Sequence, residues 1–225
     1  LGPDYDVDRH FTPTYNPWDQ RLCLAPDADM FNEIKSGRAS VVTDHIETFT
    51  ERGVRLKSGQ ELDADVVVSA TGLVLEVWNG IAVSVDGQAV DPGRTLAYKG
   101  MMYEGVPNLA SAFGYTNASW TLKCDLTCEY VCRLLNHMKK TGSTTVVPVN
   151  DDPSVTFEPW LDFSSGYVQR AMAKFPKQGN KVPWKLNQNY ALDLMSLRYS
   201  KLEDGVLRFS RAAGRSAGAP EKLAA

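Results

Sequence analysis

Apolar and polar positions alternate most clearly between residues 53 and 72 of this chain. Val54 and Leu56 share one side of an alternating segment, Ser58-Gly59 supplies a turn, and Leu62 leads into the run DADVVVSATG at residues 63–72. A run of β-branched residues that stops at a small residue and a glycine is typical of a buried strand ending in a tight turn. The pattern therefore predicts a hairpin that feeds a buried strand over 63–72.

Further short strands are predicted on both sides of that run. Apolar residues between Ala39 and Phe49 indicate one or two strands, and Asp86-Gly87 between two apolar stretches indicates a hairpin. Two more strands are expected at 98–103 and 107–114, the second closed by a glycine. Val146-Val147 is expected to add an edge strand.

Helical periodicity is strongest after Gly114. Five apolar positions recur every four residues there: Leu122, Leu126, Tyr130, Leu134 and Met138. We expect a helix that Asn117 or Ser119 caps and that ends near Thr141-Gly142.

The two ends of the chain are expected to differ from its middle. Pro13 and Pro17 favour an irregular N-terminal stretch, whereas 164–175 and 188–199 look helical. Trp160 and Trp184 are expected to anchor this last part on the body. Residues from about Ser210 onward read as a tail, which would include the basic cluster Arg208, Arg211 and Arg215.

Composition narrows the possible classes of protein. The 225 residues are 43% hydrophobic, enough to bury a core in one or two domains. The net charge is −3 with the two signs interspersed, so no footprint for nucleic acid or an anionic membrane is visible. No stretch is long and apolar enough for a transmembrane segment, and a cytoplasmic setting is the default expectation.

Several well-known motifs are missing from the sequence. No two of the 17 glycines are separated by a single residue, so G-x-G-x-x-G does not occur. The motifs H-E-x-x-H and G-x-S-x-G are absent too, which argues against metalloproteases and hydrolases.

Cys124, Cys128 and Cys132 are spaced four apart, along one face of the predicted helix. Metal binding by three helical thiols is conceivable, but no C-x-x-C pair supports it. We therefore predict no metal site and expect a buried stripe of small residues on a core helix.

The predicted strand, turn and helix around Gly114 form a place where a cofactor could sit. A helix N-terminus offers free N–H groups and the positive end of a dipole to an electron-rich group. The alternative is an ordinary connection between a strand and a helix.

Three segments together resemble one family, the class B flavoprotein monooxygenases, which include Baeyer–Villiger and flavin-containing monooxygenases. Within this family they resemble the mycobacterial type of Baeyer–Villiger monooxygenase. The segments are HFTPTYNPWDQR at 10–21, DADVVVSATG at 63–72, and VPNL at 106–109 with GYTNASWTL at 114–122. Their order and separation fit the family over most of residues 1–200.

The resemblance implies a reaction and two cofactors. NADPH would reduce FAD, the flavin would capture O2 as a C4a-(hydro)peroxyflavin, and one oxygen would pass to a ketone, sulfide or amine. In the Baeyer–Villiger branch, a positively charged arginine would stabilise the anionic peroxide of the flavin and hold the nicotinamide in place. Arg21 matches the position of that arginine. Without the family, an arginine in a Pro/Trp-rich loop is usually a surface or packing residue.

The same resemblance assigns further residues to the cofactor site. Ala70, Thr71 and Gly72 would pass close to FAD, where small residues allow the backbone to approach. The turn from Gly114 would carry the chain past the isoalloxazine, with Asn117, Ala118 and Ser119 near the flavin. Trp120 either lines the substrate pocket or is a core aromatic at the start of the helix.

The resemblance also implies an α/β fold containing parts of two dinucleotide-binding domains. Residues 1–62 would be the C-terminal part of the NADPH-binding domain and 63–142 the C-terminal part of the FAD-binding domain. A mainly helical lobe at 143–209 and a disordered tail at 210–225 would follow.

Because the two phosphate-binding loops have no counterpart here, the chain looks like the C-terminal half of such an enzyme, a truncated record or a gene remnant. The isolated chain is then expected to be inactive, and its unpaired strands would favour self-association. The alternatives are a non-catalytic remnant or binding module without cofactor, and a flavin-dependent reductase, which would need a redox cysteine pair.

Overall fold

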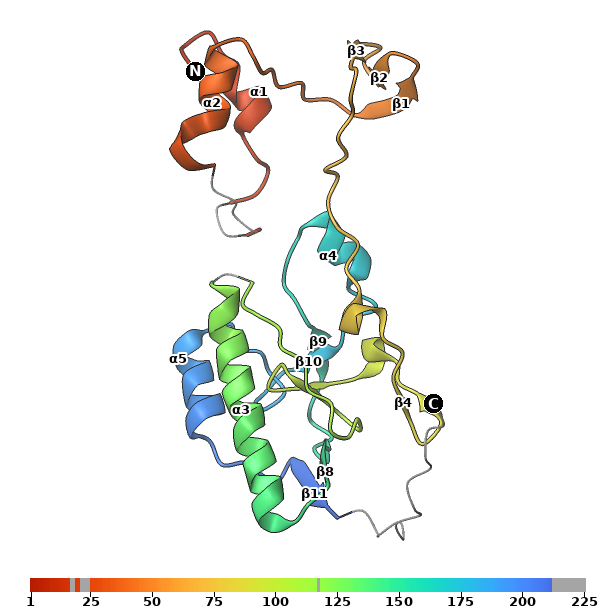
Figure 1. The fold of residues 1–225 in the computed structure, drawn as a ribbon, viewed down its shortest axis with the longest axis vertical. Coiled ribbons are helices and arrows are strands. Elements are labelled where there is room, and N and C mark those ends of the chain that lie inside the picture. Colours follow the sequence, from red (N-terminus) through yellow and green to blue (C-terminus); the bar gives the residue numbers. More distant parts are fainter. Residues whose placement is uncertain (17–18, 21–24, 117, 212–225) are drawn as a thin grey trace, which may run out of the picture. The chain divides into compact units, whose positions relative to one another are not determined.

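The computed structural model describes residues 1–16, 19–20, 25–116 and 118–211. It divides into two compact units, Leu1–Leu73 and Val74–Ala225, which are treated separately below. Figure 1 shows short helices and strands in the first unit and the long helix α3 in the second. The expected mixed α/β composition is confirmed, with strands gathered into small sheets.

The N-terminal unit begins with short helices. They are α1 (Val7–Phe11), the 3-10 turn η1 (Pro26–Ala28) and α2 (Asp29–Lys35). The expectation of an irregular start is wrong at α1, because Asp6 caps this helix by accepting from the Arg9 N–H at 3.1 Å. The helix ends before Pro13, so the proline does not interrupt it.

A three-stranded antiparallel sheet follows, with β2 in its centre. Its strands are β1 (Ile46–Thr50), β2 (Gly53–Leu56) and β3 (Glu61–Asp63). Val54 and Leu56 are buried, and the Gly59 N–H donates to the Leu56 carbonyl, so the predicted hairpin and its turn are confirmed. The apolar pair Val41-Val42 forms no strand.

The strand expected over 63–72 is not formed beyond Asp63. The Ala64 N–H still donates to the Arg52 carbonyl at 2.8 Å, but residues 65–72 belong to no strand. The side chains of Val66 and Val68 are 78% and 83% exposed. A buried strand needs neighbours on both edges and cover on both faces. The part of the chain that the structure describes supplies neither for this run, which explains why the prediction of burial is wrong here.

The C-terminal unit is built around helix α3 (Trp120–Thr141). Four of the five predicted apolar positions are buried, while Leu122 is 42% exposed. The helix ends at Gly142, which adopts φ +70° and whose N–H bonds the Met138 carbonyl, as expected of a glycine cap. The stop and register of this helix are therefore confirmed. The helix begins after Ser119 as expected, but the Ser119 side chain does not cap it, and Asn117 lies outside the described residues.

Two tight hairpins lie before α3. The predicted turn at Asp86-Gly87 joins β4 (Ser84–Val85) and β5 (Gln88–Ala89), and both turn residues have positive φ. The expected single strand at 98–103 is instead a second hairpin of β6 (Ala97–Tyr98) and β7 (Met102–Tyr103). Lys99 and Gly100 turn the chain with positive φ, which a continuous strand does not allow.

The strand expected at 107–114 is also wrong. Only Ala110 makes a bridge there, to Met102, and Asn108 sits in a turn with φ +57°. The Asn108 side chain bonds the backbone of β8 (Thr145–Pro148) instead, accepting from the Val146 N–H at 2.9 Å. The Asn108 backbone N–H also donates to the Val146 carbonyl at 2.9 Å, so this residue fixes the turn to β8 through both its side chain and its backbone.

The last part of the chain combines helices with short strands. Its elements are β9 (Phe157–Pro159), α4 (Gly166–Ala171), β10 (Lys177–Gly179), α5 (Tyr190–Asp193), the π-helical turn η4 (Leu194–Tyr199) and β11 (Leu207–Ser210). The predicted strand at Val146-Val147 is confirmed as β8, which pairs with β11. Short 3-10 turns, η2 (Val77–Gly80) and η3 (Pro92–Arg94), complete the unit.

Two basic residues expected in a tail belong to the folded body. Arg208 lies in β11 and binds Asp151, and the Arg211 Nε donates to the Gly142 carbonyl at 2.9 Å. The predicted tail, from residue 212 on and including Arg215, lies outside the described residues.

Two apolar clusters hold the C-terminal unit together. Trp184 belongs to the cluster that α3 and the β6–β7 hairpin share, and Trp160 belongs to a cluster with α4. Both indoles are almost fully buried, which confirms them as packing anchors.

The cysteines do not form the buried stripe that their spacing suggested. Cys128 and Cys132 are exposed and Cys124 is half-buried, because α3 buries the neighbouring face that carries Leu126, Tyr130 and Leu134. None of the described helices is long and apolar enough to cross a membrane.

Candidate functional site

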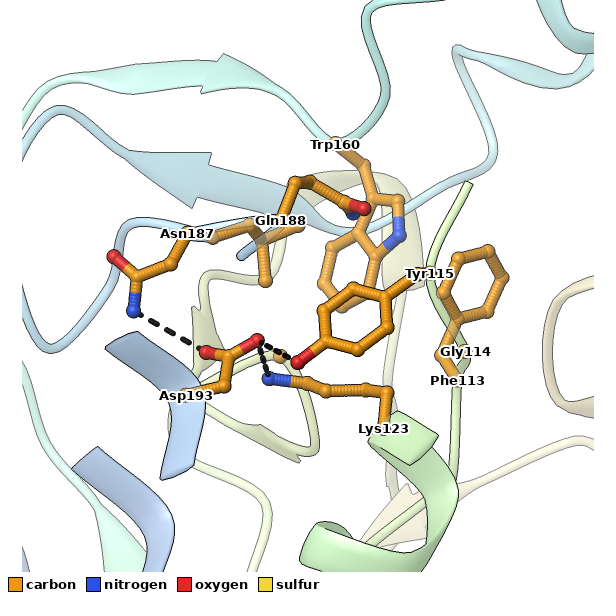
Figure 2. A pocket seen from close by; sticks show the side chains of 10 residues that line it. Phe113, Gly114, Tyr115, Lys123, Trp160, Asn187, Gln188 and Asp193 are labelled. Carbon is orange, nitrogen blue, oxygen red and sulfur yellow. Dashed lines mark hydrogen bonds and ion pairs between the residues drawn. The ribbon is translucent and has the colours of Figure 1, made fainter. Parts of the chain in front are cut away.

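A small hollow lies in the C-terminal unit beside the first turn of α3 (Figure 2). Tyr115 and Lys123 reach it from the α3 side, Asp193 from α5, and Trp160 from the residue after β9. Its enclosed space is about 10 Å³, roughly the room that one water molecule needs.

Asp193 is the centre of the polar side of this hollow. Its Oδ2 receives the Lys123 ammonium at 2.8 Å and the Tyr115 hydroxyl at 2.8 Å, and its Oδ1 receives the Asn187 amide at 3.2 Å (Figure 2). Both charged side chains are less than a tenth exposed. Three donors from other elements therefore converge on one buried carboxylate.

Burial shifts the pKa of the two partners in opposite directions. Desolvation lowers the pKa of Lys123, and the Asp193 charge opposes that shift. Desolvation raises the pKa of Tyr115, and the hydrogen bond and charge of Asp193 raise it further. Tyr115 is thus a hydrogen-bond donor to Asp193 at neutral pH.

Aromatic rings form the other side of the hollow. Phe113 stands edge-on to Trp160, with ring centroids 5.8 Å apart, and lies 4.8 Å from Trp120. Trp160 is 3% exposed, and its indole Nε1–H has no hydrogen-bond partner among the described atoms.

The turn that precedes α3 is held from one side. The backbone N–H and the hydroxyl of Thr116 both donate to the Gln188 Oε1, each at 3.2 Å. Gly114 is buried beneath the Trp120 ring, where a Cβ would come within 2.2 Å of the indole. Glycine is therefore required for the close packing of this turn on the helix.

The start of α3 is left open on its other side. The Ser119 hydroxyl bonds Thr121 at 3.0 Å and caps no backbone N–H of the helix. Ala118 and Ser119 are exposed, and among the described residues no side chain is seen to cap the first-turn N–H groups of this 22-residue helix.

Four of the predicted site residues therefore lie together at this turn: Gly114, Ala118, Ser119 and Trp120. Asn117 lies outside the described residues. Trp120 is 44% exposed and packs on Phe113, so the alternative of a core aromatic is wrong.

The other predicted residues lie in the N-terminal unit or outside the description. Ala70, Thr71 and Gly72 belong to the exposed segment 64–73, where Gly72 has φ +103°. Arg21 lies outside the described residues. Their predicted roles stay predictions.

Sequence reasoning missed the buried polar centre. Lys123 and Thr127 stand on the buried face of α3 beside Leu126. A lysine inside an apolar helical stripe was the available signal, because a buried ammonium requires an acidic partner. Asp193, 70 positions later, could not be identified as that partner by spacing alone.

The described residues fit one edge of a flavin. The N-terminus of α3, which the Ser119 side chain does not cap, and the exposed Ala118–Ser119 backbone could receive an electron-rich ring edge. The sequence offers no Gly-rich loop for the pyrophosphate.

Comparison with known proteins gives a consistent picture. The chain is 53% identical over 211 residues to the FAD-containing monooxygenase EthA of Mycobacterium tuberculosis, covering 94% of this chain and 43% of that protein. It is 50% identical over 204 residues to the probable FAD-binding monooxygenase AlmA of Acinetobacter baylyi, with 90% and 41% covered.

A third relative is the putative FAD-containing monooxygenase MymA of M. tuberculosis, 45% identical over 220 residues, with 97% of this chain and 44% of that protein covered. No family model and no solved structure matches the chain. The chain thus spans less than half the length of these curated relatives, and it belongs, as a partial chain, to the family of FAD-containing monooxygenases.

Proposed function

We propose that this chain forms the C-terminal portion of an FAD- and NADPH-dependent monooxygenase that transfers one oxygen atom from O2 to a ketone, sulfide or amine. The observation that carries the proposal is the identity of 45–53% to three monooxygenases over at least nine-tenths of the chain. The family resemblance of the three segments supports the choice of cofactors and of substrate class.

In this proposal the turn before α3 receives the flavin. Backbone N–H groups of the first helical turn would bind an electron-rich edge of the ring, and Ala118 and Ser119 would line that edge. When bound, FAD would supply the activation of O2. Gln188 and the Asp193 cluster would hold the turn in place through Thr116 and Tyr115.

Two further assignments belong to the proposal. Ala70, Thr71 and Gly72 would pass near the flavin, and Arg21 would supply the positive charge that holds the nicotinamide and stabilises developing negative charge. We propose that the chain alone does not retain FAD, because tight pyrophosphate binding needs Gly-rich loops that its sequence lacks.

Complementation tests the proposal directly. The chain is produced alone, and together with the stretch of EthA that it does not match. After desalting, retained flavin is measured by absorbance, and NADPH oxidation is measured with and without O2. We expect flavin and O2-dependent oxidation only in the pair. A pair that assembles without flavin would favour a non-catalytic binding module.

A matched substitution tests the position of the flavin. Ser119→Asp supplies a helix cap but places a negative charge before the first turn, whereas Ser119→Asn supplies a neutral cap of similar size. We expect the Asp variant of the pair to retain at least several-fold less FAD than the Asn variant. Equal retention would move the flavin away from α3.

A further inference from the structure

The hollow beside α3 has one hydrogen-bonding group that the protein leaves unused. Asp193 already accepts from three donors, and the Gln188 carbonyl already accepts from Thr116. The Trp160 indole is 3% exposed, and its Nε1–H, which can only donate, has no partner among the described atoms. Leaving such a buried donor unpaired carries a free-energy cost that an acceptor would remove.

The unused donor lies on the aromatic side of the hollow. In Figure 2 the indole nitrogen of Trp160 is on the side of the ring that faces Phe113, away from the Lys123–Asp193 pair. Phe113 in turn contacts Trp120, which is 44% exposed. Ring contacts therefore connect the exposed Trp120 through Phe113 to the buried Trp160.

Charge and size restrict the molecule that could use this donor. The ammonium of Lys123 and the carboxylate of Asp193 are paired with each other, so the hollow offers no uncompensated charge to an ionic ligand. The enclosed space of about 10 Å³ admits one acceptor atom and excludes a ring. The body of the ligand would therefore rest outside, on Phe113 and Trp120.

We propose that Trp160 donates a hydrogen bond to the oxygen of an uncharged organic molecule whose apolar body packs on Phe113 and Trp120. This binding site uses residues that the proposed flavin site does not need. It therefore stands without the proposed function, although such a ligand is of the class that a monooxygenase would oxidise.

The test follows the indole N–H signals of the chain by NMR, without flavin. The protein is labelled with ¹⁵N-tryptophan, which gives signals from 5 indoles. The signal that is missing from the spectrum of Trp160→Phe is that of the Trp160 indole. Acetophenone is titrated as the probe. Ethylbenzene is the matched control, because it has the same shape without the carbonyl oxygen.

We expect acetophenone to shift the Trp160 signal saturably and ethylbenzene to leave it in place. Trp78 does not line the hollow and serves as the internal control in each spectrum. Trp160→Phe should weaken acetophenone binding by about 2- to 10-fold, the range of one net hydrogen bond. The wild-type titration decides the matter even if this variant folds poorly.

Three outcomes would overturn the proposal. They are no shift with acetophenone, an equal shift with both compounds, and a Trp160 N–H that stays bonded to a trapped water molecule at saturating acetophenone. Each is independent of flavin retention in the complementation experiment, so the two proposals fail separately.

Discussion

At the scale of single residues, Lys123 and Asp193 form an ion pair in the C-terminal unit in which both charged side chains are less than a tenth exposed. Asp193→Asn keeps the shape of the side chain but leaves the Lys123 ammonium buried without its counter-charge. We expect a loss of about 3–5 kcal/mol in the free energy of unfolding, measured by urea titration. The same carboxyl-to-amide change at Asp151, which is 65% exposed, should have little effect.

A double variant tests whether Lys123 and Asp193 stabilise the fold through their contact with each other. The double variant Lys123→Met with Asp193→Leu removes both charges together. It should lose less stability than the two single losses added, since no charge is left unpaired. Strict additivity would mean that the two side chains stabilise the fold through separate contacts.

Lys99 makes the stability of this unit depend on pH. Its ammonium donates to the Ser196 carbonyl at 2.7 Å and to the Ser200 hydroxyl at 2.8 Å, at the π-helical turn η4. Desolvation lowers the pKa of Lys99 to about 8, although the Asp204 charge opposes the shift. The folded chain therefore releases this proton at lower pH than the unfolded chain does.

Because the unfolded state binds more protons above about pH 8, the free energy of unfolding should rise with pH there, with Lys99 contributing at most about 1.4 kcal/mol per pH unit. Urea titrations at about pH 7.5 and about pH 9.5 should show this rise in the wild type and a smaller rise in Lys99→Met, in which the buried Lys123, whose pKa desolvation also lowers, still contributes. Lys139→Met, at an exposed position of α3, should keep the wild-type behaviour.

Individual residues also show where sequence reasoning stops. Gly114, Ser119 and Trp120 were found because they are contiguous, and local order survives in any fold. Tyr115 and Asp193 were missed because their contact joins positions 78 residues apart. Such pairs depend on how helices pack, which the spacing within one segment does not encode.

At the scale of elements, prediction succeeded where local pattern and burial agree. Helix α3 has a repeating apolar face and a glycine stop, and both are realised. The run 63–72 has an equally clear pattern but requires neighbouring strands, so its pattern alone does not produce the element. The β6–β7 hairpin was missed because Lys99 takes a positive φ, which lysine rarely does.

The face of α3 that carries the stability can be separated from its exposed face. Leu126 is fully buried in the cluster around Tyr98 and Tyr130, whereas Leu135 is 58% exposed. Leu126→Ala should cost about 2–5 kcal/mol, since it leaves a cavity. Leu135→Ala should stay within about 0.5 kcal/mol. Similar losses in both variants would mean that another surface covers Leu135.

At the scale of the whole molecule, the segment 64–73 is the exposed run at the end of the N-terminal unit. Its valines lack hydrogen-bonded neighbours among the described residues, so a protease has free access to the backbone. Thermolysin, which cuts before large apolar residues, should cleave within 66–74 well before it cleaves the interior of α3. Intact-mass measurement of the products identifies the site of cleavage. Cleavage inside α3 before cleavage within 66–74 would contradict the prediction that α3 is the better protected segment.

The same cleavage reports what covers the valines. If copies of the chain associate through this run, as its unpaired β-branched residues suggest, cleavage within 66–74 should slow as protein concentration rises at a fixed ratio of protease to substrate. If the run instead enters a sheet supplied by the remaining length of a relative, adding that stretch should protect it at low concentration, where self-association is weak. Protection should then rise in step with retained flavin, because the strand that ends at Thr71-Gly72 and the flavin would be held by one sheet. Cleavage that is unchanged by both concentration and the added stretch would show that the run stays uncovered, and Ala70, Thr71 and Gly72 would lose their proposed place beside FAD.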